Sequence, residues 1–363
     1  EALRARPPAR PDGKPSIVFW CGPSNEMWSP ASIAKGVGGS EEAVIFLSRE
    51  LAALGWHVEV YADPPSADIG LDAHGVLWQP HYVWEASDEA GVFVGWRQGH
   101  PKAAIAQGLG SRCGQRWLWL HDAIVPEYLN HPWTEALTGV FCLTEFHAKK
   151  LPEALRPKLV LTQNGINPDF LVDGPNKATE LIYASSPDRG LEYVLLEWPK
   201  IKAAIPEARL HIYYGFTKHW TAAEGSFPEL RRIRSEVNRL KEQEGVVWHG
   251  MVGQKELSQA FADCGFWLYP TEWPETSCIT AMKAQAMGAI PITSRFPEWG
   301  VPETTQFDLG PPPRDGSLYK NAEWLAEWSA TVIASIPRQD LGPMRESMKS
   351  WARETYSWAK VAD

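Results

Sequence analysis

One group of residues able to do chemistry lies late in the chain, where an apolar run gives way to a helical pattern. Glu275 stands just before that pattern, and Ser277, Cys278 and Ile279 open it. A carboxylate there can accept hydrogen bonds from ligand hydroxyl groups, and the first amide groups of a helix carry partial positive charge. We expect these three N–H groups to face the same ligand as Glu275, and Lys283, under two turns further on, to reach it too.

A second group follows an earlier apolar run, in the sequence Ser185-Ser-Pro-Asp-Arg189-Gly190. Ligands of open α/β sheets bind beyond the carboxyl ends of the strands. A guanidinium is planar and permanently charged, which suits it to a diphosphate. The position of Arg189 therefore favours a binding role over that of a solvated surface residue.

A glycine-rich run near the amino terminus, Gly36-Val-Gly-Gly-Ser40, precedes a helical pattern that Glu41 and Glu42 open. Glycine lets the backbone approach a ligand closely, and a helix start attracts anions. Gly38, Gly39 and Ser40 are therefore candidates for binding a phosphate or a sugar oxygen. The run is not a dinucleotide-binding fingerprint, because some fifteen residues separate it from the preceding strand.

Strand-like and helical runs alternate along the whole chain, which is typical of parallel sheets covered by helices. Strands are expected at 16–20, 56–61, 117–120, 139–143, 181–184, 209–214, 245–249, 266–269 and 289–293. Helices are expected after Glu41 and at 191–204, 255–263 and 277–287. We predict an α/β fold with domains at 16–165 and 166–345, followed by a terminal helical segment at 346–363.

Size and composition agree with two globular domains. The chain has 363 residues, more than one hydrophobic core usually supports. Its net charge of −9 argues against a large nucleic-acid surface, which would be basic. Nineteen tryptophans are compatible with stacking on sugar rings, although most should simply fill the cores.

The five cysteines are scattered without a CxxC pair, so neither a zinc site nor a disulfide framework is predicted. This cysteine usage fits a reducing, cytoplasmic setting. With no run of eighteen apolar residues and no signal peptide at the start, we expect no transmembrane segment. The first fifteen residues contain ARPPARPDGKP, which predicts a Pro-rich linker over 1–15 and a chain cut from a longer multidomain protein.

These motifs, in their order and spacing, resemble glycosyltransferase family four, the large retaining family with GT-B architecture. Glu275 matches the first glutamate of its Glu-x7-Glu element, which contacts the donor sugar. Position 283 matches the second, which usually holds the ribose hydroxyls, but Lys stands here. Thr276-Ser-Cys278 replaces the usual Gly-Phe-Gly, and Ala184 stands where a partner Arg is expected.

Other parts of the family pattern occur in the same order from Ser16 onward. His121, a lone histidine that would otherwise be read as structural, resembles the acceptor-side histidine near the reacting carbon. Asp188-Arg-Gly190 resembles Glu-Lys-Gly, and the His249-Gly-Met-Val252 turn resembles the one whose backbone reads the base. The resemblance therefore adds Gly250 and Met251 to the binding candidates. Gly38-Gly-Ser-Glu41, Asn164-Gly-Ile-Asn167 and Tyr356-Ser-Trp-Ala-Lys360 resemble the glycine loop, the hinge turn and the terminal helix.

The resemblance implies a GT-B fold: two facing Rossmann-like domains, acceptor side first and donor side second, with the terminal helix packing back on the first. It implies retaining, metal-independent transfer of a hexosyl or pentosyl group from a nucleotide diphosphate sugar, with no cofactor besides this donor. His121 and Glu275 would be catalytic, and Arg189 would grip the diphosphate. The acceptor stays open between a glycan, a lipid, a protein and a modified nucleobase.

Two other readings stay open. Lys283 and the missing partner Arg are compatible with a degenerate module that binds a carbohydrate or nucleotide without chemistry. A sugar-nucleotide epimerase of the same architecture would need no acceptor. A pyridoxal-phosphate phosphorylase is disfavoured, because no lysine has a suitable Schiff-base context.

Overall fold

The computed structural model describes residues 13–85, 88–97, 112–122, 129, 132–296, 300–313 and 321–363, and most of the expected linker at 1–15 lies outside them. The chain divides into two compact units. Unit 1 contains residues 1–33, 37–165 and 358–363, and unit 2 contains residues 34–36 and 166–357. The main division thus falls between Gly165 and Ile166, at the turn cluster where the sequence analysis places a domain boundary.

Unit 1 is built on an eight-stranded sheet with the order β3-β4-β2-β1-β5-β6-β7-β8. The strands are β1 (Ser16–Trp20), β2 (His57–Ala62), β3 (Gly70–Leu71), β4 (Val76–Pro80), β5 (Glu89–Trp96), β6 (Arg112–Trp119), β7 (Gly139–Cys142) and β8 (Leu159–Leu161). Every pair is parallel except β3 with β4. Helix α1 (Gly39–Ala53) packs on β2 and β4, and the short α4 (Glu145–Lys149) follows β7.

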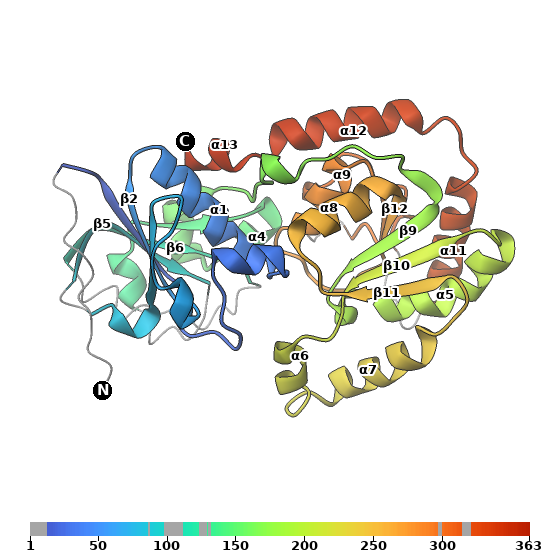
Figure 1. Cartoon of the computed structure of the whole chain (residues 1–363), viewed down its shortest axis with the longest axis horizontal. Coiled ribbons are helices and arrows are strands. Elements are labelled where there is room, and N and C mark those ends of the chain that lie inside the picture. Colours follow the sequence, from blue (N-terminus) through green and yellow to red (C-terminus); the bar gives the residue numbers. More distant parts are fainter. Residues whose placement is uncertain are drawn as a thin grey trace. The chain divides into compact units, whose positions relative to one another are not determined.

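Unit 2 contains a five-stranded parallel sheet with the order β11-β10-β9-β12-β13. Its strands are β9 (Lys177–Ser185), β10 (Arg209–Tyr214), β11 (Val246–Gly250), β12 (Cys264–Tyr269) and β13 (Ile290–Thr293). Helices α8 (Gln254–Asp263) and α9 (Ile279–Ala286) cover one face, and α5 (Leu191–Ala204) and α11 (Ala322–Ser335) cover the other (Figure 1). The described part of unit 2 also contains the α-helices α6 (Lys218–Ala223), α7 (Pro228–Leu240), α10 (Gly300–Glu303) and α12 (Gly342–Thr355).

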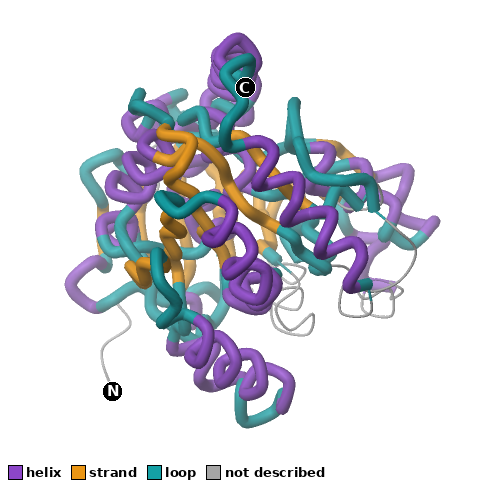
Figure 2. The backbone as a smooth tube through the Cα atoms, turned by 90° about the vertical axis from the view of Figure 1, so that its right-hand side faces the viewer, coloured by secondary structure: helices purple, strands orange, loops and turns teal. Residues whose placement is uncertain are grey.

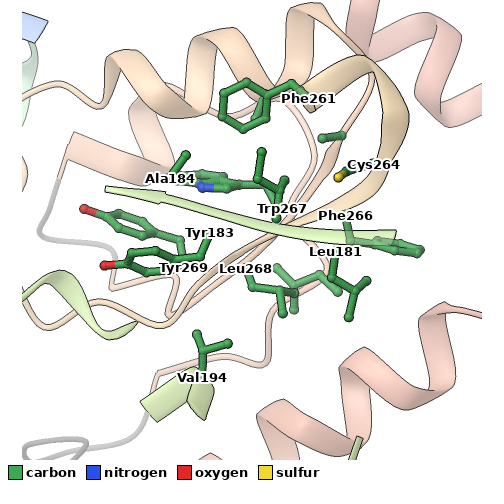
Figure 3. Packing of buried hydrophobic residues seen from close by; sticks show 14 of the residues in the cluster. Leu181, Tyr183, Ala184, Val194, Phe261, Cys264, Phe266, Trp267, Leu268 and Tyr269 are labelled. Carbon is green, nitrogen blue, oxygen red and sulfur yellow. The ribbon is translucent and has the colours of Figure 1, made fainter. Parts of the chain in front are cut away.

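Figure 2 shows from a second direction that helices flank the strands. A sheet covered by helices on both faces needs strands with apolar side chains on both faces. All six residues of β12 are buried. Figure 3 shows Phe261 of α8 and Val194 of α5 on opposite sides of the strands. Tyr183 and Tyr269 lie side by side there, with their hydroxyl groups pointing the same way beyond the core. The sheet core thus ends in two phenol groups at the edge where the strands finish.

The terminal segment, residues 346–363, was expected to pack on the first domain as a whole, and the structure differs. It forms two helices, and the longer one, α12, packs on α9 of unit 2. Arg353 holds it there by donating a hydrogen bond to the carbonyl group of Ala286, the last residue of α9, and Arg345 does the same to that of Gly288, two residues later. Only the short α13 (Trp358–Ala362) packs on α1 of unit 1. Arginine bonds to these carbonyl groups explain why most of the segment stays with unit 2.

All five cysteines are free and buried. Within the described ranges, no helix is long and apolar enough to cross a membrane.

Candidate active site

Both sheets have one place where the strand order reverses, and ligands of open α/β sheets bind in the crevice at such a switch point. In unit 1 the chain leaves β1 for β2 on one side and later adds β5 on the other. In unit 2 it leaves β9 for β10 on one side and later adds β12 on the other. The loops after β1, β5, β9 and β12 are therefore where each unit can hold a ligand. Most of the candidate residues follow one of these four strands.

In unit 2 the loops after β9 and β12 are packed tightly against each other. Gly190 has a φ of +104°, and a Cβ atom there would lie 2.3 Å from the carbonyl oxygen of Pro270. Only glycine combines that backbone conformation with so close a contact. The turn that carries Arg189 is thereby fixed against the loop that carries Glu275.

The side chain of Arg189 stacks on an aromatic ring from the neighbouring loop. Its Cζ atom lies 3.2 Å from the ring centroid of Trp273, an arrangement that attracts a cation to the ring. One guanidinium nitrogen, Nη1, is 3.3 Å from Asp188 Oδ2. That nitrogen is buried and forms no hydrogen bond. The other carboxylate oxygen of Asp188, Oδ1, is also buried and forms none. A buried donor without an acceptor is costly, and a ligand oxygen would satisfy it.

Glu275 lies in the same loop and receives a short hydrogen bond from the hydroxyl of Tyr269, at the end of β12. The Ser185 hydroxyl lies 3.4 Å from that Tyr269 oxygen, which links the ends of β9 and β12. Burial raises the pKa of Glu275 and the charge of Asp188 adds to this effect, while Arg189 and the Tyr269 hydrogen bond oppose it. Glu275 is therefore a carboxylate whose charge depends on its neighbours.

The helix after Glu275 begins slightly later than expected, at Ile279, with Cys278 as its N-cap residue. Ser277 and Ile279 are partly exposed, and Cys278 is buried. Burial raises the pKa of the Cys278 thiol well above its usual value, and the charge of Glu275 raises it further. The thiol is thus neutral and no nucleophile, so these three residues can offer a ligand only backbone amide groups and the Ser277 hydroxyl.

Lys283 is buried between α8 and α9. Its Nζ atom donates a hydrogen bond to Gln254 Oε1 at 2.7 Å, and the residue is 6% exposed. A long charged side chain is rarely buried without such a partner. A contact between Lys283 and a nucleotide stays a prediction.

Gly250 and Met251 lie in the turn after β11. Gly250 has a φ of +74°, and Met251 is 37% exposed. A Cβ atom on Gly36 would lie 2.5 Å from Met251 Cγ, so the start of the glycine-rich run packs on this turn within unit 2. The turn therefore supports residues 34–36, and its proposed contact with a base stays a prediction.

The rest of the glycine-rich run belongs to unit 1, where α1 begins at Gly39 with Gly38 as N-cap residue. A Cβ atom on Gly38 would lie 2.3 Å from Glu41 Oε2, so glycine makes room for the Glu41 carboxylate. Ser40 lies in the first turn and is partly exposed. These positions thus have a structural reason in addition to the binding role predicted for them.

Arg97, which the sequence analysis missed, joins the loops around this switch point. It follows β5 with a φ of +60°, which is rare for a residue other than glycine. Its guanidinium forms two hydrogen bonds with Asp122, at 2.6 and 2.7 Å, and one with Glu41 at 3.2 Å. Strained backbone often marks functional sites. A single cation therefore holds the carboxylates that follow β1 and β6.

His121 lies among aromatic rings beside this ion cluster. Its ring centroid is 4.5 Å from that of Trp119 and 5.9 Å from that of Trp96. Burial lowers the pKa of His121 to about 3, and the positive charge of Arg97 contributes, although Asp122 opposes the change. His121 is therefore a neutral imidazole at physiological pH, able to share hydrogen bonds but not to supply a positive charge.

His147 holds the loop of His121 and Asp122 through a backbone hydrogen bond. Its Nδ1 atom accepts the Leu143 amide hydrogen at 3.3 Å, so its Nε2–H group donates to the Asp122 carbonyl oxygen at 3.0 Å. Burial lowers the pKa of His147 to about 4, and its bond to Asp122 opposes the change. No local pattern singles out His147 among the histidines, because its two partners follow different strands, β7 and β6.

Arg189 and Glu275 thus lie together in unit 2, and His121 lies with Arg97 and the start of α1 in unit 1. The structure adds Tyr269 and Trp273 to the first group and Arg97 to the second. In the part of the chain that the structure describes, no three His, Cys, Asp or Glu side chains are grouped so as to hold a metal ion.

Comparison with known proteins shows a likeness in fold alone. No protein-family model matches the chain, and no curated protein matches its sequence. Among solved structures, the chain is similar to sucrose-phosphate synthase from Thermosynechococcus elongatus, with a TM-score of 0.67 and 16% identity over 96% of both chains.

Two further structures are similar over the same extent. Anabaena HepE, solved with UDP-glucose, has a TM-score of 0.65 at 12% identity over 96% of this chain and 97% of its own. A glycosyltransferase from Rickettsia africae has a TM-score of 0.62 at 14% identity over 96% of both chains. The expected α/β fold of the GT-B class is confirmed by these matches, which span nearly the whole chain.

Proposed function

We propose that this chain is a glycosyltransferase that takes a sugar from a nucleotide diphosphate sugar and transfers it to an acceptor hydroxyl. The observation that carries the proposal is the group at the switch point of unit 2. There a buried, hydrogen-bond-deficient Arg189 nitrogen lies in packed loops with a carboxylate, Glu275. A phosphate oxygen supplies the missing acceptor, and sugar hydroxyl groups supply donors for the carboxylate.

We assign the donor to unit 2. Breaking the glycosidic bond leaves negative charge on the departing diphosphate, and fixed positive groups lower the barrier to that step. Arg189, held by Trp273 and Asp188, is such a group. The amide groups of Ser277, Cys278 and Ile279 at the start of α9 add partial positive charge. Glu275 orients the sugar and stabilises the positive charge that develops on its ring.

We assign the acceptor to unit 1. His121 is neutral and offers a hydrogen-bonding imidazole to a hydroxyl group. Gly38, Gly39 and Ser40, at the start of α1, offer backbone amide groups to a sugar oxygen.

Two finer features belong to the proposal and rest on the family resemblance. Transfer retains the anomeric configuration of the sugar, which proton NMR coupling constants of the first-formed product would show. Arg189 and helix amide groups supply the charge that stabilises the diphosphate, so transfer proceeds without an added divalent cation. Full activity in EDTA supports this second feature, and activity that returns only with magnesium or manganese contradicts it.

The first experiment is a thermal-shift panel of UDP-, GDP-, ADP- and CMP-sugars. HepE was solved with UDP-glucose, which makes UDP-glucose the first ligand to test. A ligand at a hundred times its dissociation constant stabilises a protein by about 2.7 kcal/mol. We expect at least one donor to raise the melting temperature. An unchanged melting temperature with every nucleotide sugar of the panel would contradict the proposal.

The second experiment separates an enzyme from a binding module. Release of nucleoside diphosphate is measured with the donor chosen by the panel, for wild type and for Glu275→Ala. We expect the variant to fold, to bind the donor, and to lose most turnover. Donor binding without any turnover by the wild type would instead indicate the degenerate module, and interconversion of the donor without acceptor would indicate an epimerase.

A further inference from the structure

Three tryptophans of unit 1 form one group with His121: the rings of Trp96 and Trp119 contact the imidazole, and the ring of Trp28 contacts that of Trp96. We call Trp28, Trp96 and Trp119 the indole cluster. Trp96 and Trp119 are the last residues of β5 and β6 and are paired in the sheet. Trp28 reaches them from the loop after β1, with its ring centroid 5.7 Å from that of Trp96. The cluster therefore lies at the ligand-binding edge of the sheet, around the imidazole assigned to the acceptor.

The indole N–H groups of this cluster have nothing to bond to. Trp28, Trp96 and Trp119 are only 3%, 5% and 2% exposed, and in the described structure none of their Nε1 atoms has a hydrogen-bond partner. Nearby indoles show the usual situation: Trp78 donates to Asp72 and Trp20 to the His81 carbonyl oxygen.

Buried donors are paired in the great majority of cases, so three unpaired donors in one connected group of rings require an explanation. Trp84, Trp267 and Trp358 also bury an unpaired Nε1, so a single unpaired indole does not by itself mark a ligand site. The indole cluster differs because its three rings form one connected group with His121. The indole cluster is thus a set of donors that lacks acceptors, and a ligand with several closely spaced oxygens would provide them.

The charges around the cluster favour a neutral ligand. The Arg97 guanidinium lies 5.2 Å from the Trp96 ring, but Asp122 and Glu41 already bind it. One cation with two carboxylates leaves an excess of negative charge, and His121 is uncharged at neutral pH. A phosphate or carboxylate would meet repulsion here. Hydroxyl groups can both accept from indole N–H groups and donate to the partly exposed carboxylate of Asp122.

We propose that the indole cluster is the acceptor subsite and that the acceptor is a neutral carbohydrate. Indole rings pack on the apolar faces of a sugar ring while their N–H groups bind its oxygens. A lipid chain would leave the donors unpaired. This inference rests on the proposed function, since it names the substrate that unit 1 presents for transfer.

The test replaces each cluster tryptophan by phenylalanine, which keeps an apolar ring and removes the N–H group. Transfer is measured with the best donor and three kinds of acceptor: neutral mono- and disaccharides, a Ser/Thr peptide, and phosphatidylglycerol vesicles. We expect transfer to a saccharide, and a threefold to tenfold higher acceptor KM for each variant with an unchanged donor KM. Each of these variants loses buried ring volume but no protein hydrogen bond, so its melting temperature should fall less than that of the control, which loses both.

Trp78→Phe is the matched control, because Trp78 is equally buried in unit 1 but its indole is paired. It should melt lower and keep the acceptor KM within twofold. Transfer to the peptide or the vesicles alone, or saccharide KM values unchanged in all three cluster variants, overturns the inference while leaving the proposed function intact. Failure of the wild type to bind any donor instead refutes the proposed function.

Discussion

Tyr269→Phe tests the role of Glu275 without touching the carboxylate itself. The Tyr269 hydroxyl donates a short hydrogen bond to Glu275 and thereby opposes the rise in its pKa that burial causes. Removing the hydroxyl leaves the ring and the core packing in place. The ionised form of Glu275 loses a donor, so its pKa must rise further.

The size of the effect follows from the bond that is lost. A hydrogen bond to a charged group contributes about 1.5–3 kcal/mol. Part of the Glu275 surface is exposed to solvent, so the lower end of this energy range applies. About 1.4 kcal/mol corresponds to a factor of ten in an equilibrium constant. If the ionised carboxylate is needed for transfer, the acid limb of the kcat/KM profile moves by about one pH unit to higher pH.

The assay is the release of nucleoside diphosphate between pH 4.5 and 8.5, with both substrates held below their KM. Tyr183→Phe is the control, since Tyr183 lies beside Tyr269 but donates to the Ser186 carbonyl oxygen at 2.7 Å (Figure 3). Its acid limb should stay where the wild-type limb is. An unmoved limb in Tyr269→Phe, or equal movement in both variants, refutes the reasoning.

Three further predictions concern packing and charge at Gly190, Glu275 and His121. Gly190→Ala puts a Cβ atom 2.3 Å from the Pro270 oxygen at a φ of +104°, so it should cost more than the roughly 1–2 kcal/mol of a left-handed alanine and weaken donor binding. Gly55→Ala, at +94° with no atom within 4 Å, should show only that backbone cost in urea unfolding. Glu275→Gln should raise the melting temperature at pH 7.5, since burial raises the pKa of Glu275 and its charge therefore destabilises the fold. That gain should vanish as the pH falls through the folded pKa and the wild type takes up a proton; an equal gain at every pH would contradict it. The His121 imidazole should stay neutral in ¹⁵N NMR down to about pH 4, because its folded pKa is about 3. Unfolding should become easier as pH falls from about 6.5 toward 3, and His121→Gln should lose part of this dependence.

The fold of unit 2 followed from its sequence because its elements are regular. The helix expected at 191–204 and the strand expected at 209–214 have those same bounds in the structure. In unit 1, β4 and β5 were not predicted. β4 ends in a proline and β5 contains Gly91 and Gly95, so neither shows the continuous branched or aromatic pattern of a strand. Arg97 was missed for that reason, since its significance depends on following β5.

The candidate site was predictable where one loop carries several groups, as with Glu275 and the start of α9. It was not predictable where partners come from distant segments. The Arg189–Trp273 contact depends on β9 and β12 being neighbours, and the Lys283–Gln254 pair depends on the packing of α8 with α9. Strand order and helix packing determine which of these side chains meet, and the local sequence pattern predicts neither.

The binding of nucleoside diphosphate by Arg189 is the claim on which the account depends most, and calorimetric titration tests it directly. The diphosphate of the preferred donor is titrated into wild type, Arg189→Ala and Arg338→Ala, the last being an exposed arginine paired with Asp340 elsewhere in unit 2. Loss of a charge-assisted contact worth about 1.5–3 kcal/mol predicts a dissociation constant at least tenfold higher for Arg189→Ala. Arg338→Ala should bind like the wild type. Equal affinities for all three proteins would contradict the account.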